Sequence, residues 1–165
     1  MNKTALRLGR KNSSTISTLM FIGGFALWAA PDIQAELNPS ETEASVMYNI
    51  QITLGKNVIT GTLDDTPTVR DFVKQLPLKL KLEDYSSTEK IAYLPNKLST
   101  QNAGAGFDPD VGDITYYAPW GNLAIFYQDF GYSHNLIRLG RITSGMEHLR
   151  YRNAKQATIE IISLP

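Results

Sequence analysis

Short stretches in which apolar and polar residues alternate recur from residue 46 onward, and they constrain the fold more than any other feature of the sequence. The clearest is YNIQITL at residues 48–54, where tyrosine, isoleucine and leucine alternate with asparagine, glutamine and threonine. A period of two is typical of a half-buried β-strand. A turn follows at residues 55–57, and residues 58–63 return as a second strand, which predicts a hairpin.

The rest of this region adds more strands and little helix. Thr66 and Pro67 form a helix start, and the following apolar residues recur at i, i+3, i+4 and i+7, so a short helix ending before Pro77 is expected to cover an open end of the sheet. A single helical turn is expected over 146–150. Further strands are predicted over residues 78–82, 89–94, 114–117, 123–127, 136–142 and 158–162.

These elements predict a mainly β fold, with about eight strands and one or two short helices. A closed or nearly closed β-barrel is favoured, because closure removes exposed sheet edges. A β-sandwich is the alternative, since periodicity does not distinguish the two architectures.

The first 35 residues follow a different pattern. A basic start is followed by the uncharged apolar run 19–30, then Pro31, and the segment ends on Ala35. This order is typical of a secretory signal peptide cleaved near Ala35. It predicts a periplasmic or secreted protein, whose only expected membrane contact is the leader itself if it stays uncleaved. Residues 36–45 are a polar lead-in, and residues 46–165 form the predicted domain.

The charge and the lack of cysteine limit the classes of partner and membrane anchor that are expected. The leader contains four basic residues and one acidic residue, so its removal leaves 12 basic and 15 acidic residues. An excess of acidic residues argues against nucleic acid, whose binding proteins carry a basic footprint. The chain has no cysteine, which excludes a lipid-anchored lipoprotein and means that the core alone must hold the domain together.

An aromatic stretch, TYYAPWGNLAIFYQDFGYS, is the strongest candidate for a binding surface. Seven of its nineteen residues, 115–133, are aromatic. Alternation places the adjacent rings Tyr116 and Tyr117 on opposite faces, and likewise Phe126 and Tyr127. One ring of each pair should therefore face the core and the other a groove. Tyr and Trp combine apolar area with a polar tip, which suits recognition. Trp120 lies in a predicted turn and is the best candidate for an exposed ring.

Several motifs together are similar to one family. TLDDTPTVRDFVKQLPLKLKLEDY, EKIAYLP, VGDITYYAPWGNLAIFYQDFGYS and LGRITSG resemble the small bacterial cyclophilin-like proteins, and the resemblance covers about residues 46–162. It implies a cyclophilin-type β-barrel without implying a settled activity. Cyclophilins proper are prolyl isomerases that use an arginine beside a pocket of Phe, Trp, Gln and His on the outer face of the barrel. That set has no residue-by-residue counterpart in this chain.

Two arginines are candidate donors beside the aromatic stretch. Arg138 and Arg141 lie three apart on a predicted strand, so alternation places them on opposite faces. Only one of them is then expected to reach a given pocket, and Arg141 is taken as the polar anchor. The candidate ligand-binding residues are Tyr116, Tyr117, Trp120, Phe126, Tyr127, Phe130 and Arg141.

Metal and cofactor chemistry has little support in the sequence. The acidic segment 108–113 is read as a turn, because the twelfth position of an EF-hand loop counted from Asp108 is proline rather than glutamate. His134 and His148 are fourteen residues apart with no cysteine between them, which argues against a zinc site. Neither a metal nor a cofactor is therefore predicted.

The sequence favours an exported barrel that binds a small apolar ligand or an extended peptide without catalysis. The alternative is a peptidyl-prolyl isomerase that assists folding in the cell envelope, which rests on the fold analogy. A structural partner domain in a larger envelope complex is a third possibility. Catalytic residues are not assigned.

Overall fold

The computed structural model describes residues 47–163 of the 165-residue chain. The predicted signal peptide, residues 1–35, and the lead-in, residues 36–45, lie outside this part. None of the helices within 47–163 is long and apolar enough to cross a membrane.

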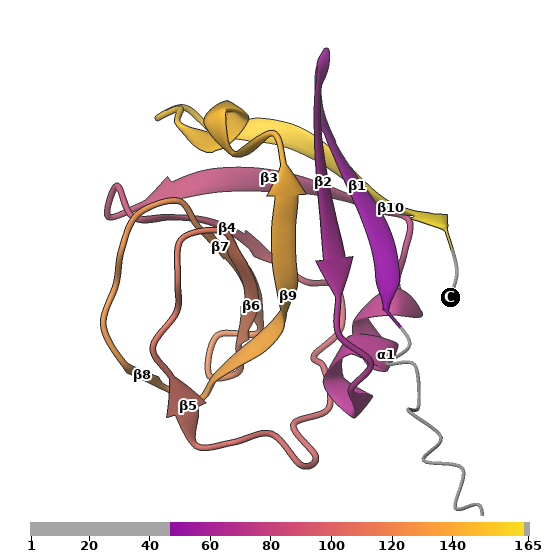
Figure 1. Ribbon diagram of the computed structural model, residues 1–165, viewed down its shortest axis with the longest axis vertical. Coiled ribbons are helices and arrows are strands. Elements are labelled where there is room, and N and C mark those ends of the chain that lie inside the picture. The colour runs from indigo at the N-terminus through magenta and orange to yellow at the C-terminus, as the bar shows by residue number, and fades with distance from the viewer. Residues whose placement is uncertain (1–46, 164–165) are drawn as a thin grey trace, which may run out of the picture. The chain divides into compact units, whose positions relative to one another are not determined.

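The described residues fold into the predicted closed barrel of eight strands, with one α-helix and one 3-10 turn (Figure 1). Its strands are β1 (Tyr48–Leu54), β2 (Asn57–Leu63), β3 (Leu78–Tyr85), β4 (Glu89–Tyr93), β6 (Asp113–Tyr117), β7 (Asn122–Phe126), β9 (Leu136–Ser144) and β10 (Lys155–Ser163). The helix is α1 (Pro67–Val73), and the 3-10 turn is η1 (Met146–Leu149).

Each barrel strand pairs antiparallel with two neighbours. The order around the barrel is β1, β10, β3, β4, β7, β6, β9 and β2, which pairs with β1 again. A separate two-stranded ribbon, β5 (Gly106–Phe107) and β8 (Ser133–His134), lies outside the barrel (Figure 1). The sequence did not reveal this ribbon, because two residues are too few to show an alternation.

The core fills the inside of the barrel. Alternate residues of β1, β2 and β3 point inward, among them Ile50, Ile59 and Leu82, which are fully buried. Val69 and Phe72 of α1 join the same cluster, as the helical spacing predicted. The helix therefore contributes its apolar face to the barrel interior.

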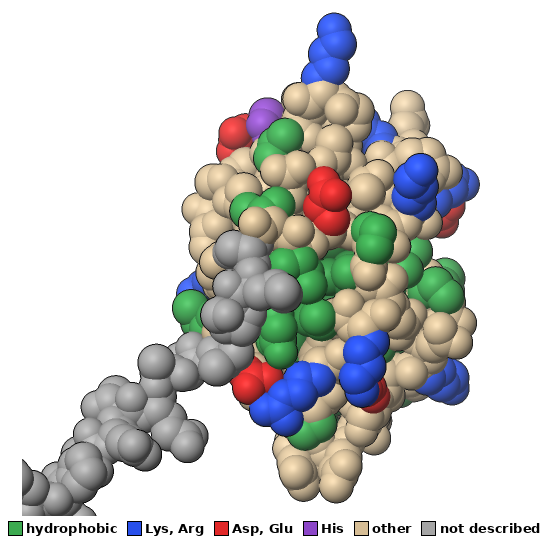
Figure 2. Space-filling view, turned by 90° about the vertical axis from the view of Figure 1, so that its right-hand side faces the viewer, with side chains coloured by type: hydrophobic (Ala, Val, Ile, Leu, Met, Phe, Trp, Pro, Cys, Tyr) green, Lys and Arg blue, Asp and Glu red, His purple; other side chains and the backbone are tan. Residues whose placement is uncertain are grey.

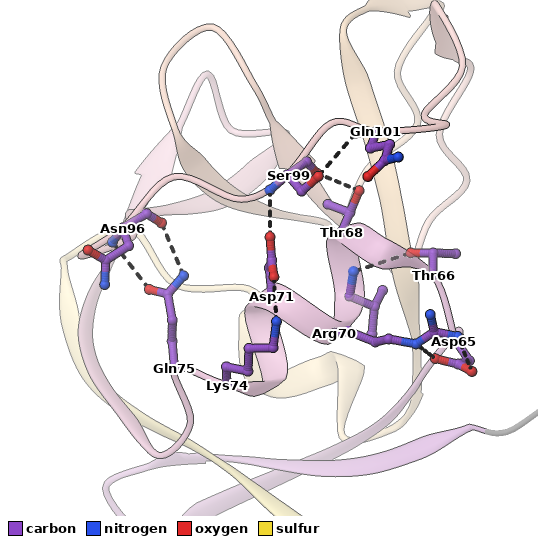
Figure 3. Close-up of polar contacts among 11 residues, drawn as sticks. Asp65, Thr66, Thr68, Arg70, Asp71, Lys74, Gln75, Asn96, Ser99 and Gln101 are labelled. Carbon is purple, nitrogen blue, oxygen red and sulfur yellow. Dashed lines mark hydrogen bonds and ion pairs between the residues drawn. The ribbon is translucent and has the colours of Figure 1, made fainter.

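Polar contacts hold α1 in place (Figure 3). The Thr66 side chain accepts a hydrogen bond from the Val69 amide at 3.2 Å, which caps the helix. The Thr68 hydroxyl donates to the Ser99 carbonyl at 2.7 Å, and the Ser99 amide donates to the Asp71 carboxylate at 3.0 Å. The loop after β4 is thus fastened to the helix.

The face that carries α1 and β10 has charged side chains of both signs around a central apolar area (Figure 2). Basic side chains on this face are scattered among acidic ones rather than gathered in a stripe.

Candidate functional site

The outer face of the barrel is covered where β4 and β7 lie side by side. Ile91, Ala124, Phe126 and Leu136 form a second buried cluster there, separate from the barrel interior. Phe107 of the β5–β8 ribbon packs against this cluster. Figure 1 shows the segment from β7 to β8 arching outside the barrel on this side. The outer face is therefore built to exclude water rather than to be solvated.

A cavity of about 190 Å³ lies on this covered face. It is lined by Tyr85, Glu89, Tyr117, Trp120, Asn122, Phe126, Phe130, Ser133 and Leu136. A cavity of ~150 Å³ is enough to admit a benzene molecule. The space therefore suits one small group, such as the end of a side chain.

Strand pairing brings the lining residues together from distant parts of the sequence. Tyr85 of β3 lies opposite Glu89 of β4, and Glu89 lies opposite Phe126 of β7. Further along β7, Asn122 lies opposite Tyr117 of β6. Since all five are cross-strand partners, their side chains share the outer face.

Trp120 is the central ring of the site. It lies in the turn between β6 and β7, and its ring is 5.6 Å from Tyr85 and 5.5 Å from Tyr117, in edge-to-face geometry with both. The Trp120 side chain is nonetheless 46% exposed. Phe130, whose ring centroid is 5.6 Å from that of Phe126, is also exposed. The rim of the cavity thus presents aromatic surface to solvent.

Asn122 provides a buried polar group without a complete set of partners. The residue is 2% exposed, and its side-chain amide donates to the Leu123 carbonyl at 3.1 Å. Its Oδ1 atom accepts no hydrogen bond from any residue in the described range 47–163. A buried acceptor left unsatisfied is costly and is uncommon in native structures. The Asn122 oxygen is therefore a candidate contact for a bound molecule.

Glu89 is the acidic residue of the cavity. Within residues 47–163 its carboxyl forms no hydrogen bond or ion pair, and burial raises its pKa from its ordinary value of 4.5 to about 7. Desolvation disfavours the charged form, which explains the direction of the shift. Near neutral pH the cavity can therefore hold this group either protonated or charged.

We expect the raised pKa of Glu89 to make stability depend on pH. The folded protein holds this proton more tightly than the unfolded chain, so the free energy of unfolding should fall as pH rises from about 4.5 through about 7. Glu89→Gln should lose this pH-dependent part of the stability. At pH 8 the variant should be more stable than wild type by on the order of 1 kcal/mol, because the partial exposure of Glu89 reduces the full effect of the pKa shift. Urea unfolding at pH 5, 6, 7 and 8 measures it. Parallel stability curves for the two proteins would contradict this assignment.

The structure places four of the seven predicted site residues together. Tyr117, Trp120, Phe126 and Phe130 line the cavity. Their alternation with buried neighbours also follows the expected pattern, in which one ring of each pair faces the core. The other three predicted residues lie elsewhere.

Tyr116 and Tyr127 belong to the barrel interior. The Tyr116 hydroxyl accepts a hydrogen bond from the Leu98 amide at 3.2 Å, and the ring is buried. The Tyr127 hydroxyl donates to Asp84 at 2.5 Å. Both rings pack in the core and do not line the cavity, because odd and even positions of a strand face opposite sides.

The expectation that Arg138 and Arg141 face opposite sides of the sheet is wrong. Both side chains point outward, and both lie near Asp113 Oδ1, with their Nε atoms at 3.6 Å and 3.7 Å. An irregularity in the pairing of β6 with β9 lets Thr115 face Arg138 while Ile114 faces Gly140, so Leu139 is an extra residue. Arg141 therefore pairs with the acidic turn and is not the anchor of the ring-lined cavity.

Sequence reasoning missed five residues of the cavity: Tyr85, Glu89, Asn122, Ser133 and Leu136. Tyr85 and Glu89 flank a turn of β3 and β4, some thirty residues before the aromatic stretch. Tyr85 and Glu89 reach the aromatic stretch only through the pairing of β4 with β7. Asn122 carried a weak signal, since it is a polar residue at the start of an otherwise apolar strand.

A second, larger hollow of about 570 Å³ lies near α1. Its lining includes Thr66 and Thr68 at the start of the helix and Gln101 on the neighbouring loop, as Figure 3 shows. Phe107 and Arg138 also line it. Within the part of the chain that the structure describes, no three His, Asp or Glu residues gather closely enough to hold a metal ion.

Comparisons with known proteins support the fold. A model of the cyclophilin-like family matches residues 52–160. The solution structure of the hypothetical protein AF2241 from Archaeoglobus fulgidus is similar, with a TM-score of 0.54 and 19% identity. The match covers 72% of this chain and 98% of that one. No curated protein matches the sequence.

Proposed function

Because this chain belongs to the cyclophilin-like family, whose model matches residues 52–160, we propose that it is a binding protein that uses the outer face of its barrel. The ligand group enters the cavity bounded by Trp120, Tyr117 and Phe126. The observation that carries the proposal is a partly exposed set of rings around a buried, unsatisfied asparagine oxygen. Ligand sites typically combine apolar walls with a few placed polar groups.

The size of the cavity limits what it can hold. About 190 Å³ accommodates one small molecule or one side chain, and an extended peptide would lie across the rim with a single residue inserted. The half-exposed rings of Trp120 and Phe130 would then contact the flanking groups. Binding of this kind needs no catalytic residue.

We further propose that the protein acts outside the cytoplasm, since residues 1–35 have the pattern of a signal peptide. The supporting observation is the sequence pattern alone. Intact mass measurement of the protein from a periplasmic or culture-supernatant fraction should show a chain that begins near residue 36.

Trp120→Ala should weaken ligand binding at least tenfold while leaving the melting temperature nearly unchanged, because the ring is partly exposed and its loss opens no cavity in the barrel core. The probes are N-acetyl amino-acid methylamides with leucine, phenylalanine, proline and lysine side chains, titrated by calorimetry. We expect at least one of them to bind with a Kd of ~1 mM or lower, which corresponds to about −4 kcal/mol.

Tyr93→Ala is the matched control for this prediction. Tyr93 is also an exposed ring on β4, at 63% exposure, but it does not line the cavity. Its loss should leave affinity unchanged. Equal effects of the two substitutions, or a large stability loss in Trp120→Ala, would assign Trp120 a structural role instead.

The isomerase alternative has one observation in its favour. Arg138 lines the second hollow together with Phe107 and Leu136, which places a hydrogen-bond donor beside an apolar wall. Weakening the resonance of a prolyl amide, whose rotation barrier is about 20 kcal/mol, requires such a donor. A protease-coupled assay with a proline peptide decides between the two functions, since an isomerase should accelerate the reaction and should lose this activity in Arg138→Ala.

A further inference from the structure

The ring-lined cavity has an unusual balance of polar groups. Apart from its aromatic walls it contains the Glu89 carboxyl and the Asn122 side-chain oxygen, and neither is paired within residues 47–163. When Glu89 is charged, its carboxylate and the Asn122 oxygen both accept hydrogen bonds, and one N–H of the Asn122 amide donates to the Leu123 carbonyl. The cavity therefore offers a ligand two unpaired acceptor groups, beside the hydroxyls of Ser133, Tyr85 and Tyr117, which can donate or accept.

The aromatic walls of the cavity also favour a positively charged ligand. Tyr85, Tyr117 and Trp120 come from three different elements, and their rings meet edge to face at centroid distances of 5.5 and 5.6 Å. The face of an aromatic ring carries negative potential and attracts a cation within about 6 Å of its centroid. Rings of this kind around a carboxylate form a site for an organic cation.

A metal ion fits these groups poorly. Calcium takes six to eight oxygen ligands, mainly carboxylates and carbonyls, whereas the cavity supplies one carboxylate, Glu89, one amide oxygen, Asn122, and otherwise hydroxyls and aromatic carbons. An alkylammonium ion needs fewer acceptors. Its three N–H donors match the two carboxylate oxygens and the one amide oxygen, and its alkyl chain matches the rings.

We propose that the cavity binds a primary ammonium group, held by Glu89 and Asn122 beneath the rings of Tyr85, Tyr117 and Trp120. This inference rests on the proposed function of the cavity as a ligand site and names the chemical class of the ligand. The ammonium group belongs either to a lysine side chain of an extended peptide or to a free small amine. Both have the same head group and the same apolar stem.

Binding should depend on pH through Glu89. An ammonium ion favours the charged carboxylate, so affinity should rise between pH 5.5 and pH 8 as Glu89 loses its proton. The other titratable groups that line the cavity are the hydroxyls of Tyr85 and Tyr117. Glu83, two residues before Tyr85 on β3, is exposed and paired with Lys81 at 2.7 Å.

The test uses fluorescence of Trp120. The chain has two tryptophans, so a Trp28→Phe background leaves Trp120 as the single reporter. The probes are n-butylammonium chloride, its neutral counterpart 1-butanol, and N-acetyl-lysine methylamide. At pH 8 we expect n-butylammonium to bind at least tenfold more tightly than 1-butanol. Glu89→Gln should remove this difference, and the control Glu83→Gln, which deletes a nearby charge outside the cavity, should keep it.

Each outcome has a defined meaning. Equal binding of the ammonium and the alcohol, or unchanged ammonium affinity in Glu89→Gln, would overturn the ammonium assignment and leave the cavity a neutral ligand site. Failure of all three probes here, and of every amino-acid derivative in the calorimetric titration, would overturn the proposed function as well. Binding of the lysine derivative together with n-butylammonium supports a peptide ligand, whereas binding of n-butylammonium alone supports a free amine.

Discussion

Gly140→Ala should prevent the barrel from closing and should lower the free energy of unfolding by about 4 kcal/mol or more, in the range reserved for severe steric defects. A Cβ atom at this position would lie 2.0 Å from the Thr62 carbonyl oxygen and 2.7 Å from the Leu63 Cα atom. Both atoms belong to the backbone of β2, so no side-chain rotation relieves the contact. Gly140 lies where β9 pairs with β2, one of the pairings that close the barrel.

Gly104→Ala is the matched control. A Cβ atom there would meet nothing within 4 Å, and the change should alter stability by no more than about 0.5 kcal/mol. Urea unfolding of both variants compares them directly, with limited proteolysis as the readout if Gly140→Ala has no folded baseline. An unfolding midpoint for Gly140→Ala equal to that of wild type would show that the two strands separate easily at this point.

The second large effect concerns a lysine inside the barrel. Lys90 is 0% exposed, and its ammonium forms an ion pair with Asp84 at 2.5 Å. It also donates to the Tyr151 carbonyl and lies 4.8 Å from the centre of the Tyr127 ring. The Lys90 ammonium, followed by the Tyr127 hydroxyl, holds the pKa of Asp84 below its ordinary value. The Asp84 carboxyl is thus charged at neutral pH.

Asp84→Ala should destabilise the protein by about 3 kcal/mol, because it leaves a buried ammonium without its counter-charge. The double variant Asp84→Asn with Lys90→Met removes both charges and keeps similar volume, so it should recover most of that loss. Thermal and urea unfolding of the two proteins at pH 7 measure the difference. A double variant no more stable than Asp84→Ala would mean that packing or the Tyr127 hydrogen bond, rather than the uncompensated charge, dominates.

The barrel and its family could be predicted because the relevant signals are local. Alternation in β1, β2 and β3 and the helical spacing of α1 each lie within one short segment. The motif LGRITSG, part of the resemblance to the cyclophilin-like proteins, contains Gly140, whose close approach to β2 is now explained. The family is confirmed by the match over residues 52–160, while a bacterial origin and the signal peptide stay predictions.

The lining of the ring-lined cavity was predicted only in part, because it depends on pairing between distant strands. Alternation correctly separated Tyr117, on the outer face, from Tyr116, in the core. It failed for Arg138 and Arg141, because one extra residue in β9 changes which face each position occupies. Glu89 could not be linked to the aromatic stretch, since the sequence does not state that β4 pairs with β7.

The most direct test of the ring-lined cavity as the ligand site is a ¹H–¹⁵N NMR titration that follows side-chain signals. The probes, added separately, are n-butylammonium, 1-butanol and a short proline-containing peptide. We predict that the Trp120 indole and Asn122 amide signals shift together with at least one probe, while the Gln101 and Asn102 amides of the second hollow stay unchanged. Shifts confined to Gln101 and Asn102, or no shift with any probe, would contradict the assignment.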